Sequence, residues 1–176
     1  YAKINLALNV VDKKNSLHKI ESIVSFLDLH DEILIRKIIS KNHKIKFIGK
    51  FSNNIKSKNT ISDLLENVDK KNLLKNKFQI IIKKNIPSQS GLGGGSMNAA
   101  AILNFLIKKE FIRIKKKEMI EIANLTGFDV ILGIYSKNLI LRSNNSIKTL
   151  NIHKKIYTLI VKPDFGCSTK KIYLKV

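Results

Sequence analysis

A run of glycines in the middle of the chain has the residue types that hold a phosphate group. Four glycines fall within residues 91–95 and lead into a serine. Glycine allows positive φ angles and lets the main chain approach an anion closely, and free N–H groups at a helix start point toward such an anion. The pattern predicts a phosphate-binding loop in a nucleotide-dependent enzyme. Its candidate residues are Pro87, Ser88, Gln89, Ser90, Gly91, Leu92, Gly93, Gly94, Gly95, Ser96 and Met97.

The flanking segments are typical of the elements that position such a loop. Residues 78–83 predict a strand, and residues 98–109, which begin with an alanine run, predict a helix. The spacing does not match a Walker loop, because no lysine stands between Gly95 and Ser96. It also misses the dinucleotide fingerprint, and a protein-kinase glycine loop would join two strands. The alternative is a flexible connection without a ligand.

Motifs in several regions resemble those of the GHMP kinases (galactokinase, homoserine, mevalonate and phosphomevalonate kinases). The loop, written Pro-x-x-x-Gly-Leu-Gly-Gly-Gly-Ser-x-Asn-Ala-Ala, is similar to the second motif of that family. Residues 2–6 resemble its first motif and residues 17–22 resemble its Tyr-His segment. Residues 125–130 resemble its Gly-x-Asp-Val stretch. Residues 162–173 are similar to the strand and turn that follow. The resemblance therefore covers essentially the whole chain, with the motifs in the family's order.

This resemblance implies a function and a set of site residues. It implies transfer of a phosphoryl group from ATP, with Mg²⁺, to an alcohol, and Lys3 and Asp129 as the catalytic pair. The motifs are most similar to members whose acceptor is a cytidine-diphosphate-linked sugar alcohol of the non-mevalonate isoprenoid pathway. The substrate residues carried over from those members are Asn5, His18, Thr169 and Tyr173. Leu17 departs from the family, which usually has tyrosine there, and this puts tight recognition of the cytosine base in doubt.

The two candidate catalytic residues also stand out by their surroundings. Asp129 is an acid in the apolar stretch 125–134, and Lys3 is a cation inside an apolar strand. A buried carboxylate is costly unless it is paired, so the two side chains are expected to meet. The alternatives are a helix cap or turn for Asp129, a surface lysine for Lys3, and an N-cap for Ser96.

Composition limits the other functional classes. The 176 residues carry a net charge of +20, but the lysines are scattered, and arginine and aromatic residues are few. This distribution argues against a dedicated nucleic-acid-binding surface. No apolar run reaches the roughly 20 residues that cross a bilayer, and the single cysteine, Cys167, fits a reducing compartment. We therefore expect a cytoplasmic enzyme that is not bound to a membrane. His30, His43 and His153 show no metal-site spacing.

Periodicity predicts the remaining elements. Strands are expected at residues 1–11, 78–83, 139–141 and 157–161, and helices at 60–75, 98–109 and 116–125. Residues 12–17 predict a turn, and residues 18–29 fit either a helix or a strand edge. Residues 31–39 and 44–51 predict two strands of a hairpin or meander.

These elements predict an α+β domain, strands first, with helices packed on one face of a mixed or antiparallel sheet. The resemblance implies the amino-terminal GHMP kinase domain, which is ribosomal-protein domain-2-like, over residues 1–155. Residues 156–176 would lead into a carboxy-terminal domain outside this chain. Three alternatives stay open: a GHMP kinase with another alcohol substrate, a basic nucleic-acid-binding α+β domain, and an inactive fragment.

Overall fold

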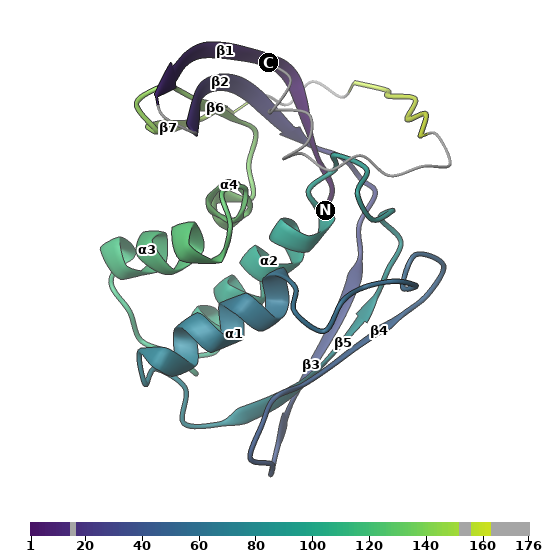
Figure 1. Cartoon of the computed structure of the whole chain (residues 1–176), viewed down its shortest axis with the longest axis vertical. Coiled ribbons are helices and arrows are strands. Elements are labelled where there is room, and N and C mark those ends of the chain that lie inside the picture. Colours follow the sequence, from purple (N-terminus) through teal and green to yellow (C-terminus); the bar gives the residue numbers. More distant parts are fainter. Residues whose placement is uncertain (15–16, 152–155, 163–176) are drawn as a thin grey trace.

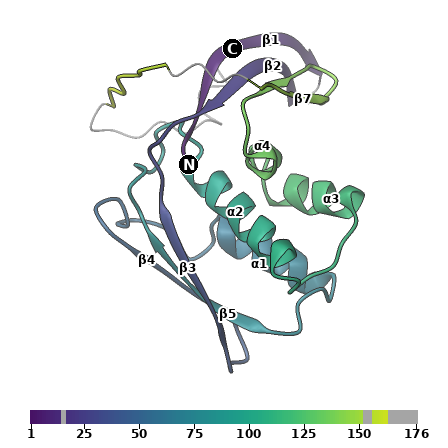
Figure 2. The same ribbon diagram turned by 180° about the vertical axis from the view of Figure 1, so that it is seen from behind.

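The computed structural model describes residues 1–14, 17–151 and 156–162. Its strands form two separate sheets, with the helices between them (Figures 1 and 2). The strands are β1 (Lys3–Lys14), β2 (Leu17–Phe26), β3 (Glu32–Ile38), β4 (Lys44–Ile48), β5 (Lys77–Lys83), β6 (Leu139–Leu141) and β7 (Ile147–Thr149). The helices are α1 (Thr60–Lys70), α2 (Gly94–Lys108), α3 (Lys116–Thr126) and α4 (Val130–Tyr135).

The first sheet has the order β1-β2-β6-β7, and all its neighbours are antiparallel. β1 and β2 pair from Lys3 with Phe26 to Lys14 with Leu17. The turn predicted at residues 12–17 was therefore too long, because both strands continue into it. The ambiguous segment 18–29 is mainly strand β2.

The second sheet has the order β3-β5-β4, so both predicted strands are present but the hairpin or meander predicted for residues 31–39 and 44–51 is wrong. β5 lies between β3 and β4, antiparallel to the first and parallel to the second. Parallel neighbours need a long crossover connection, usually a helix, and α1 supplies it between β4 and β5. The central strand is also the most buried of the three: Phe78, Ile80 and Ile82 are completely buried.

The helices were largely predicted by their apolar period. α1 buries Ile61, Leu64, Leu65 and Val68 on one face, as expected, although it ends at Lys70 rather than residue 75. α3 agrees with its prediction to within one residue. The short α4 and β7 were not predicted. Both are brief elements whose position depends on contacts with α2 and β6.

The core explains how the layers join. α1 and α2 pack on the β3-β5-β4 sheet, where Phe78, Ile102 and Leu103 belong to the main apolar cluster. A second cluster connects α2 and α4 to the other sheet through Met97, Leu132 and residues of β2 and β6. The α+β class is confirmed, but the helices lie between two sheets instead of covering one face of a single sheet.

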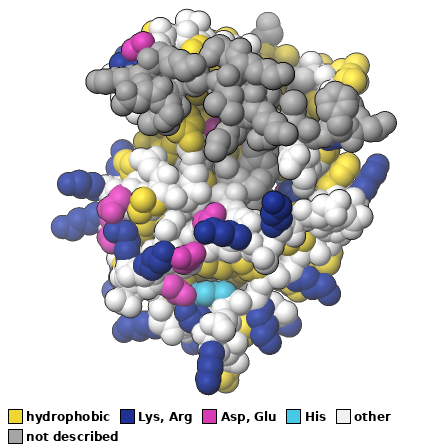
Figure 3. All heavy atoms as spheres, viewed as in Figure 1, with side chains coloured by type: hydrophobic (Ala, Val, Ile, Leu, Met, Phe, Trp, Pro, Cys, Tyr) yellow, Lys and Arg dark blue, Asp and Glu magenta, His cyan; other side chains and the backbone are white. Residues whose placement is uncertain are grey.

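The strand predicted at residues 157–161 is not present. Residues 156–162 have no regular structure, and Tyr157 and Leu159 are 97% and 89% exposed. Within the described ranges, no helix is both long and apolar enough to cross a membrane. Lys and Arg side chains are spread over the face drawn in Figure 3, with acidic groups between them, as the scattered sequence positions predicted.

Candidate active site

The start of β1 places Lys3 beside the glycine loop. The N–H of Lys3 donates to the carbonyl of Leu92 at 3.0 Å, and Ala2 is held by backbone hydrogen bonds to Leu27 and Leu29. Only 7% of the Lys3 side chain is exposed. Because the backbone is held at the loop itself, the position of the ammonium group is set by the fold rather than by solvent.

Lys3 and Asp129 meet, although they are far apart in the sequence. The Nζ atom of Lys3 lies 3.3 Å from Oδ2 of Asp129. Asp129 occupies the N-cap position of α4, but its side chain makes no capping hydrogen bond there. Its carboxylate is 32% exposed, so the expectation of a buried acid was wrong: the lysine is the buried partner and the acid faces partly outward. An ion pair with one open side leaves the carboxylate accessible to a ligand.

Gly93 is the point at which the loop touches the pair. Its φ is +67°, a left-handed conformation that residues with a Cβ rarely adopt. A Cβ atom there would lie 2.9 Å from Cγ of Lys3. Both the backbone conformation and the close approach therefore require glycine at position 93.

The N-terminus of α2 presents backbone donors to the same region. The helix starts at Gly94, four residues earlier than predicted, and Gly93 is its N-cap without a side-chain cap. Among the described residues, no backbone carbonyl accepts from the N–H groups of Gly94, Gly95 or Ser96. Ser96 lies inside the first turn and is not the N-cap that its residue type suggested. These donors suit an anion.

The two glycines at the start of α2 have a packing reason. A Cβ on Gly94 would come within 3.1 Å of Ile86, and one on Gly95 within 3.2 Å of the Thr60 hydroxyl at the start of α1. Close approach to the segment after β5 and to α1 thus selects glycine in a helical turn, in spite of its low helix propensity. The sequence pattern showed the glycines but not this neighbour contact.

Not every residue of the predicted loop faces a ligand. The N–H of Met97 donates to the carbonyl of Gly93 at 2.9 Å, and its side chain is buried between the helices and the first sheet. Leu92 packs with Ala2 and Ile86. These two residues support the loop from inside, because their apolar side chains belong to the core.

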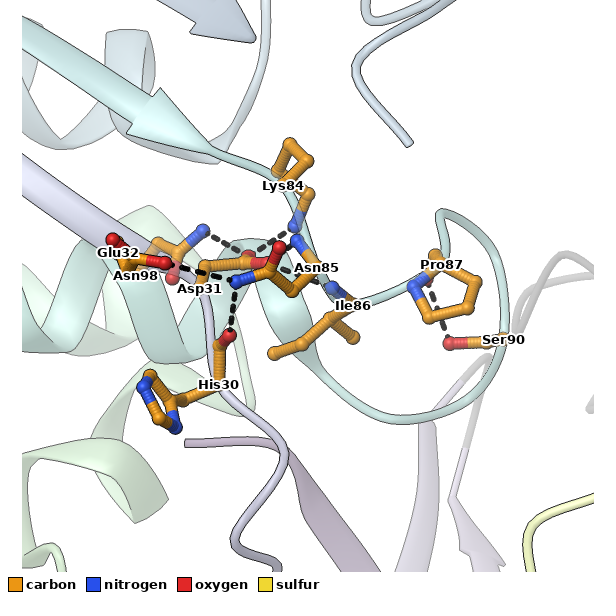
Figure 4. A network of polar contacts seen from close by, with 9 residues as sticks. All are labelled: His30, Asp31, Glu32, Lys84, Asn85, Ile86, Pro87, Ser90 and Asn98. Atoms are coloured by element: carbon orange, nitrogen blue, oxygen red, sulfur yellow. Dashed lines mark hydrogen bonds and ion pairs between the residues drawn. The ribbon is translucent and has the colours of Figure 1, made fainter. Parts of the chain in front are cut away.

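A buried polar network behind the loop was missed by the sequence reasoning. The carboxylate of Asp31 forms an ion pair with Lys84 and accepts a hydrogen bond from Nδ2 of Asn98 at 2.7 Å (Figure 4). Asn98 is therefore a buried support residue. The available signal was a lysine and an asparagine that flank the glycine run.

The predicted substrate residues are only partly described. Asn5 accepts a hydrogen bond from Lys3 at 3.4 Å and lies next to the catalytic candidates on β1. Leu17 and His18 lie in β2. Thr169 and Tyr173 fall outside the described residues.

Other features of the structure lie apart from the pair. A hollow of about 440 Å³ is lined by residues of β4 and the connection to α1, including His43, Phe47 and Asn59, and by none of the loop residues. Within the described part of the chain, no group of three or more His, Cys, Asp or Glu side chains could hold a metal ion.

Comparison with known proteins identifies relatives. Residues 57–137 match the family described as GHMP kinases N terminal domain. The chain is 56% identical, over its full length, to 4-diphosphocytidyl-2-C-methyl-D-erythritol kinase of Pelagibacter ubique and 34% identical to that of Clostridium tetani. It spans 63% of the length of each of these relatives.

Two solved structures share the fold. A 4-(cytidine 5'-diphospho)-2C-methyl-D-erythritol kinase superposes with a TM-score of 0.62 at 23% identity, over 85% of this chain and 53% of that one. Homoserine kinase from Cytophaga hutchinsonii gives a TM-score of 0.58 at 18% identity, over 79% of this chain and 51% of that one.

Proposed function

Because the chain belongs to the GHMP kinase family, we propose that it forms the ATP-binding part of 4-diphosphocytidyl-2-C-methyl-D-erythritol kinase. The enzyme would transfer the γ-phosphoryl group of ATP to the 2-hydroxyl of that substrate, in the non-mevalonate route to isoprenoid precursors. The relative that is 56% identical carries this name. The observation that carries the proposal is the Lys3–Asp129 ion pair beside the uncapped start of α2.

The loop would hold the phosphates of ATP. The positive end of the α2 helix dipole lies at its N-terminus, where the N–H groups of Gly94, Gly95 and Ser96 are found. Together with the Ser96 hydroxyl they would bind the phosphate oxygens, as helix N-termini do. Positioning and charge stabilisation are the main contributions of a protein to phosphoryl transfer, and this loop supplies both.

Lys3 and Asp129 would act on the acceptor. The oxygen of the 2-hydroxyl forms a bond to the γ-phosphorus while the bond from that phosphorus to the β,γ-bridging oxygen breaks, and ADP leaves. Asp129, with its partly exposed carboxylate, would orient the hydroxyl and is placed to accept its proton. Lys3 would hold the Asp129 carboxylate in position through their contact and would stabilise charge on the transferred group.

Mg²⁺ is part of the same proposal. Proteins usually bind this ion through one or two carboxylates plus substrate phosphates, without a complete protein cage. The site fits that mode, because Ser96 supplies a hydroxyl beside the phosphate position and Asp129 supplies a single carboxylate. The ion would neutralise phosphate charge when bound.

The acceptor would be bound by Asn5, His18, Thr169 and Tyr173, the last three at its cytidine end. Asn5 supports this assignment because it contacts Lys3 directly. We further propose that residues 1–155 form the amino-terminal domain and that residues 156–176 lead to a carboxy-terminal domain. A cytoplasmic location also belongs to this proposal.

The test is an assay of the full-length protein with ATP, Mg²⁺ and 4-diphosphocytidyl-2-C-methyl-D-erythritol. We expect Asp129→Ala and Lys3→Ala to lower kcat by about 10²- to 10⁴-fold, the usual contribution of a positioned acid–base group. Lys13→Ala, on the same strand, is the matched control for loss of a lysine. Turnover like that of the unaltered protein in both variants would reject the assigned roles.

A different acceptor alcohol is the second candidate, because Leu17 replaces the tyrosine that usually stacks on the cytosine base. Competition by free cytidine nucleotides distinguishes the cytidine-linked acceptor from another alcohol. Inhibition by cytidine diphosphate supports the cytidine-linked acceptor, and absence of inhibition supports another alcohol.

A further inference from the structure

The carboxylate of Asp31 holds both ends of the glycine loop. Asp31 precedes β3, and its side chain is completely buried. Its Oδ1 atom accepts from the N–H groups of Asn85 at 2.7 Å and Ile86 at 2.8 Å, immediately before the loop. Its Oδ2 atom accepts from Asn98 in α2, immediately after the loop. The Asp31 side chain therefore sets the distance between the residues just before segment 87–97 and the residue just after it.

Lys84 extends this arrangement to the helix start. Its ammonium group pairs with Oδ2 of Asp31 and lies 3.2 Å from the point where a Cβ on Gly94 would stand. Only 5% of the Lys84 side chain is exposed. The ammonium thus lies directly behind Gly94, with the balancing carboxylate beside it. Figure 4 shows these groups converging from the residue before β3, the residue after β5 and α2.

We propose that Asp31 is a positioning residue for nucleotide binding, acting through Lys84 and Asn98; this inference rests on the function proposed above. Asp31 lies behind the loop and is completely buried, so it acts on the nucleotide only through the residues it holds. A buried carboxylate with four donors has few alternative geometries, because each unmade hydrogen bond leaves a buried polar group unsatisfied. The loop amides are thereby held in place before the nucleotide arrives.

The adjacent residue provides a matched control. Glu32 pairs with Lys83 at 2.8 Å across β3 and β5, next in sequence to Asp31 and Lys84. These two side chains are 55% and 51% exposed, respectively. Exposed ion pairs contribute little. Glu32→Gln and Asp31→Asn thus remove the same charge from adjacent residues, but only Asp31 lies in the buried network.

The experiment uses the full-length protein and measures the Kd of Mg·ADP by calorimetry, the KM values for ATP and for the alcohol, and thermal unfolding. We expect Asp31→Asn to weaken ADP binding and raise the KM for ATP by about tenfold or more, where tenfold corresponds to about 1.4 kcal/mol. The KM for the alcohol and kcat at saturating ATP should change much less. Glu32→Gln should stay within about twofold of the unaltered protein in every quantity.

A folded Asp31→Asn variant that binds ADP like the unaltered protein overturns the inference. If this variant does not fold, Asn98→Ala tests the inference instead, because it removes only one of the hydrogen bonds to Asp31. Weaker ADP binding by Asn98→Ala supports the inference, and unchanged binding overturns it. An unaltered protein that binds ADP but does not phosphorylate the cytidine-linked alcohol contradicts the proposed acceptor and leaves the positioning role supported. An unaltered protein that binds no ADP overturns both.

Discussion

Two helices begin side by side in this molecule, and they satisfy their first backbone donors in opposite ways. At the start of α1, the side chain of Asn59 accepts from the N–H groups of Ile61 and Ser62, and Ser62 completes a capping box. At the start of α2, Gly93 has a left-handed conformation and no side chain caps the helix. The two starts approach each other where Gly95 contacts Thr60.

The difference shows which helix end can receive an anion. A capped helix start has already used its donors within the protein, whereas an uncapped one has donors left for a ligand. The surroundings agree with this assignment: Lys3 touches Gly93, and Lys84 lies behind Gly94. Capping stabilises the fold at α1, while its absence at α2 serves the proposed phosphate site.

Between the two helix starts, the largest expected effect comes from adding a side chain at the start of α2. Gly93→Ala introduces a Cβ 2.9 Å from Cγ of Lys3 and strains a residue with φ of +67°. A misplacement of Lys3 by about 1 Å lowers kcat by about 100-fold, and this is the loss we expect. Steady-state assays with the cytidine-linked alcohol measure this effect.

Gly91→Ala is the control for backbone strain alone. Gly91 also has a positive φ, of +74°, but a Cβ there meets nothing within 4 Å. This variant should lose about 1–2 kcal/mol of the free energy of unfolding and much less turnover than Gly93→Ala. Equal losses of turnover in the two variants would contradict the close contact with Lys3 as the cause.

A smaller effect is expected at the capped helix. Asn59→Ala removes the acceptor of two hydrogen bonds and should lower the free energy of unfolding by about 1 kcal/mol. Urea unfolding measures this change. Asn53→Ala, an exposed asparagine in the same connection, is the control and should have no effect. If both variants are equally stable, Asn59 does not cap α1 in solution.

The smallest effect belongs to the opposite end of α1, where Asp69 contacts His43 and Lys77. The Nδ1 atom of His43 accepts from the N–H of Phe78 at 3.0 Å, which requires a neutral ring nitrogen. Burial lowers the pKa of His43 below its ordinary 6.5, although the Asp69 carboxylate raises it.

Because the folded-state pKa is the lower one, the unfolded chain takes up the proton first as the pH falls. The stability contributed by neutral His43 is therefore complete above about pH 6.5 and decreases as the pH falls from there through the lowered pKa. Urea unfolding at about pH 7.5 and about pH 5.5 should show a larger loss in the unaltered protein than in His43→Asn. An equal loss in both proteins would contradict a neutral, buried His43.

Local patterns in the sequence were enough for several elements of the fold. The apolar period of Ile61, Leu64, Leu65 and Val68 predicted α1, because a helix must bury one face. The glycine run and its flanking segments predicted the order of strand, loop and helix. The family resemblance paired Lys3 with Asp129, and the structure brings these two side chains together.

Only the tertiary structure decided how distant segments meet. The insertion of β5 between β3 and β4 depends on the α1 crossover, and a short connection between two strands does not reveal it. The glycines at the start of α2 are selected by the close approach of Ile86 and Thr60. Residue type and local period describe what a segment prefers by itself. A buried carboxylate such as Asp31 finds its donors only when β3, β5 and α2 are packed together, because those donors come from separate parts of the chain.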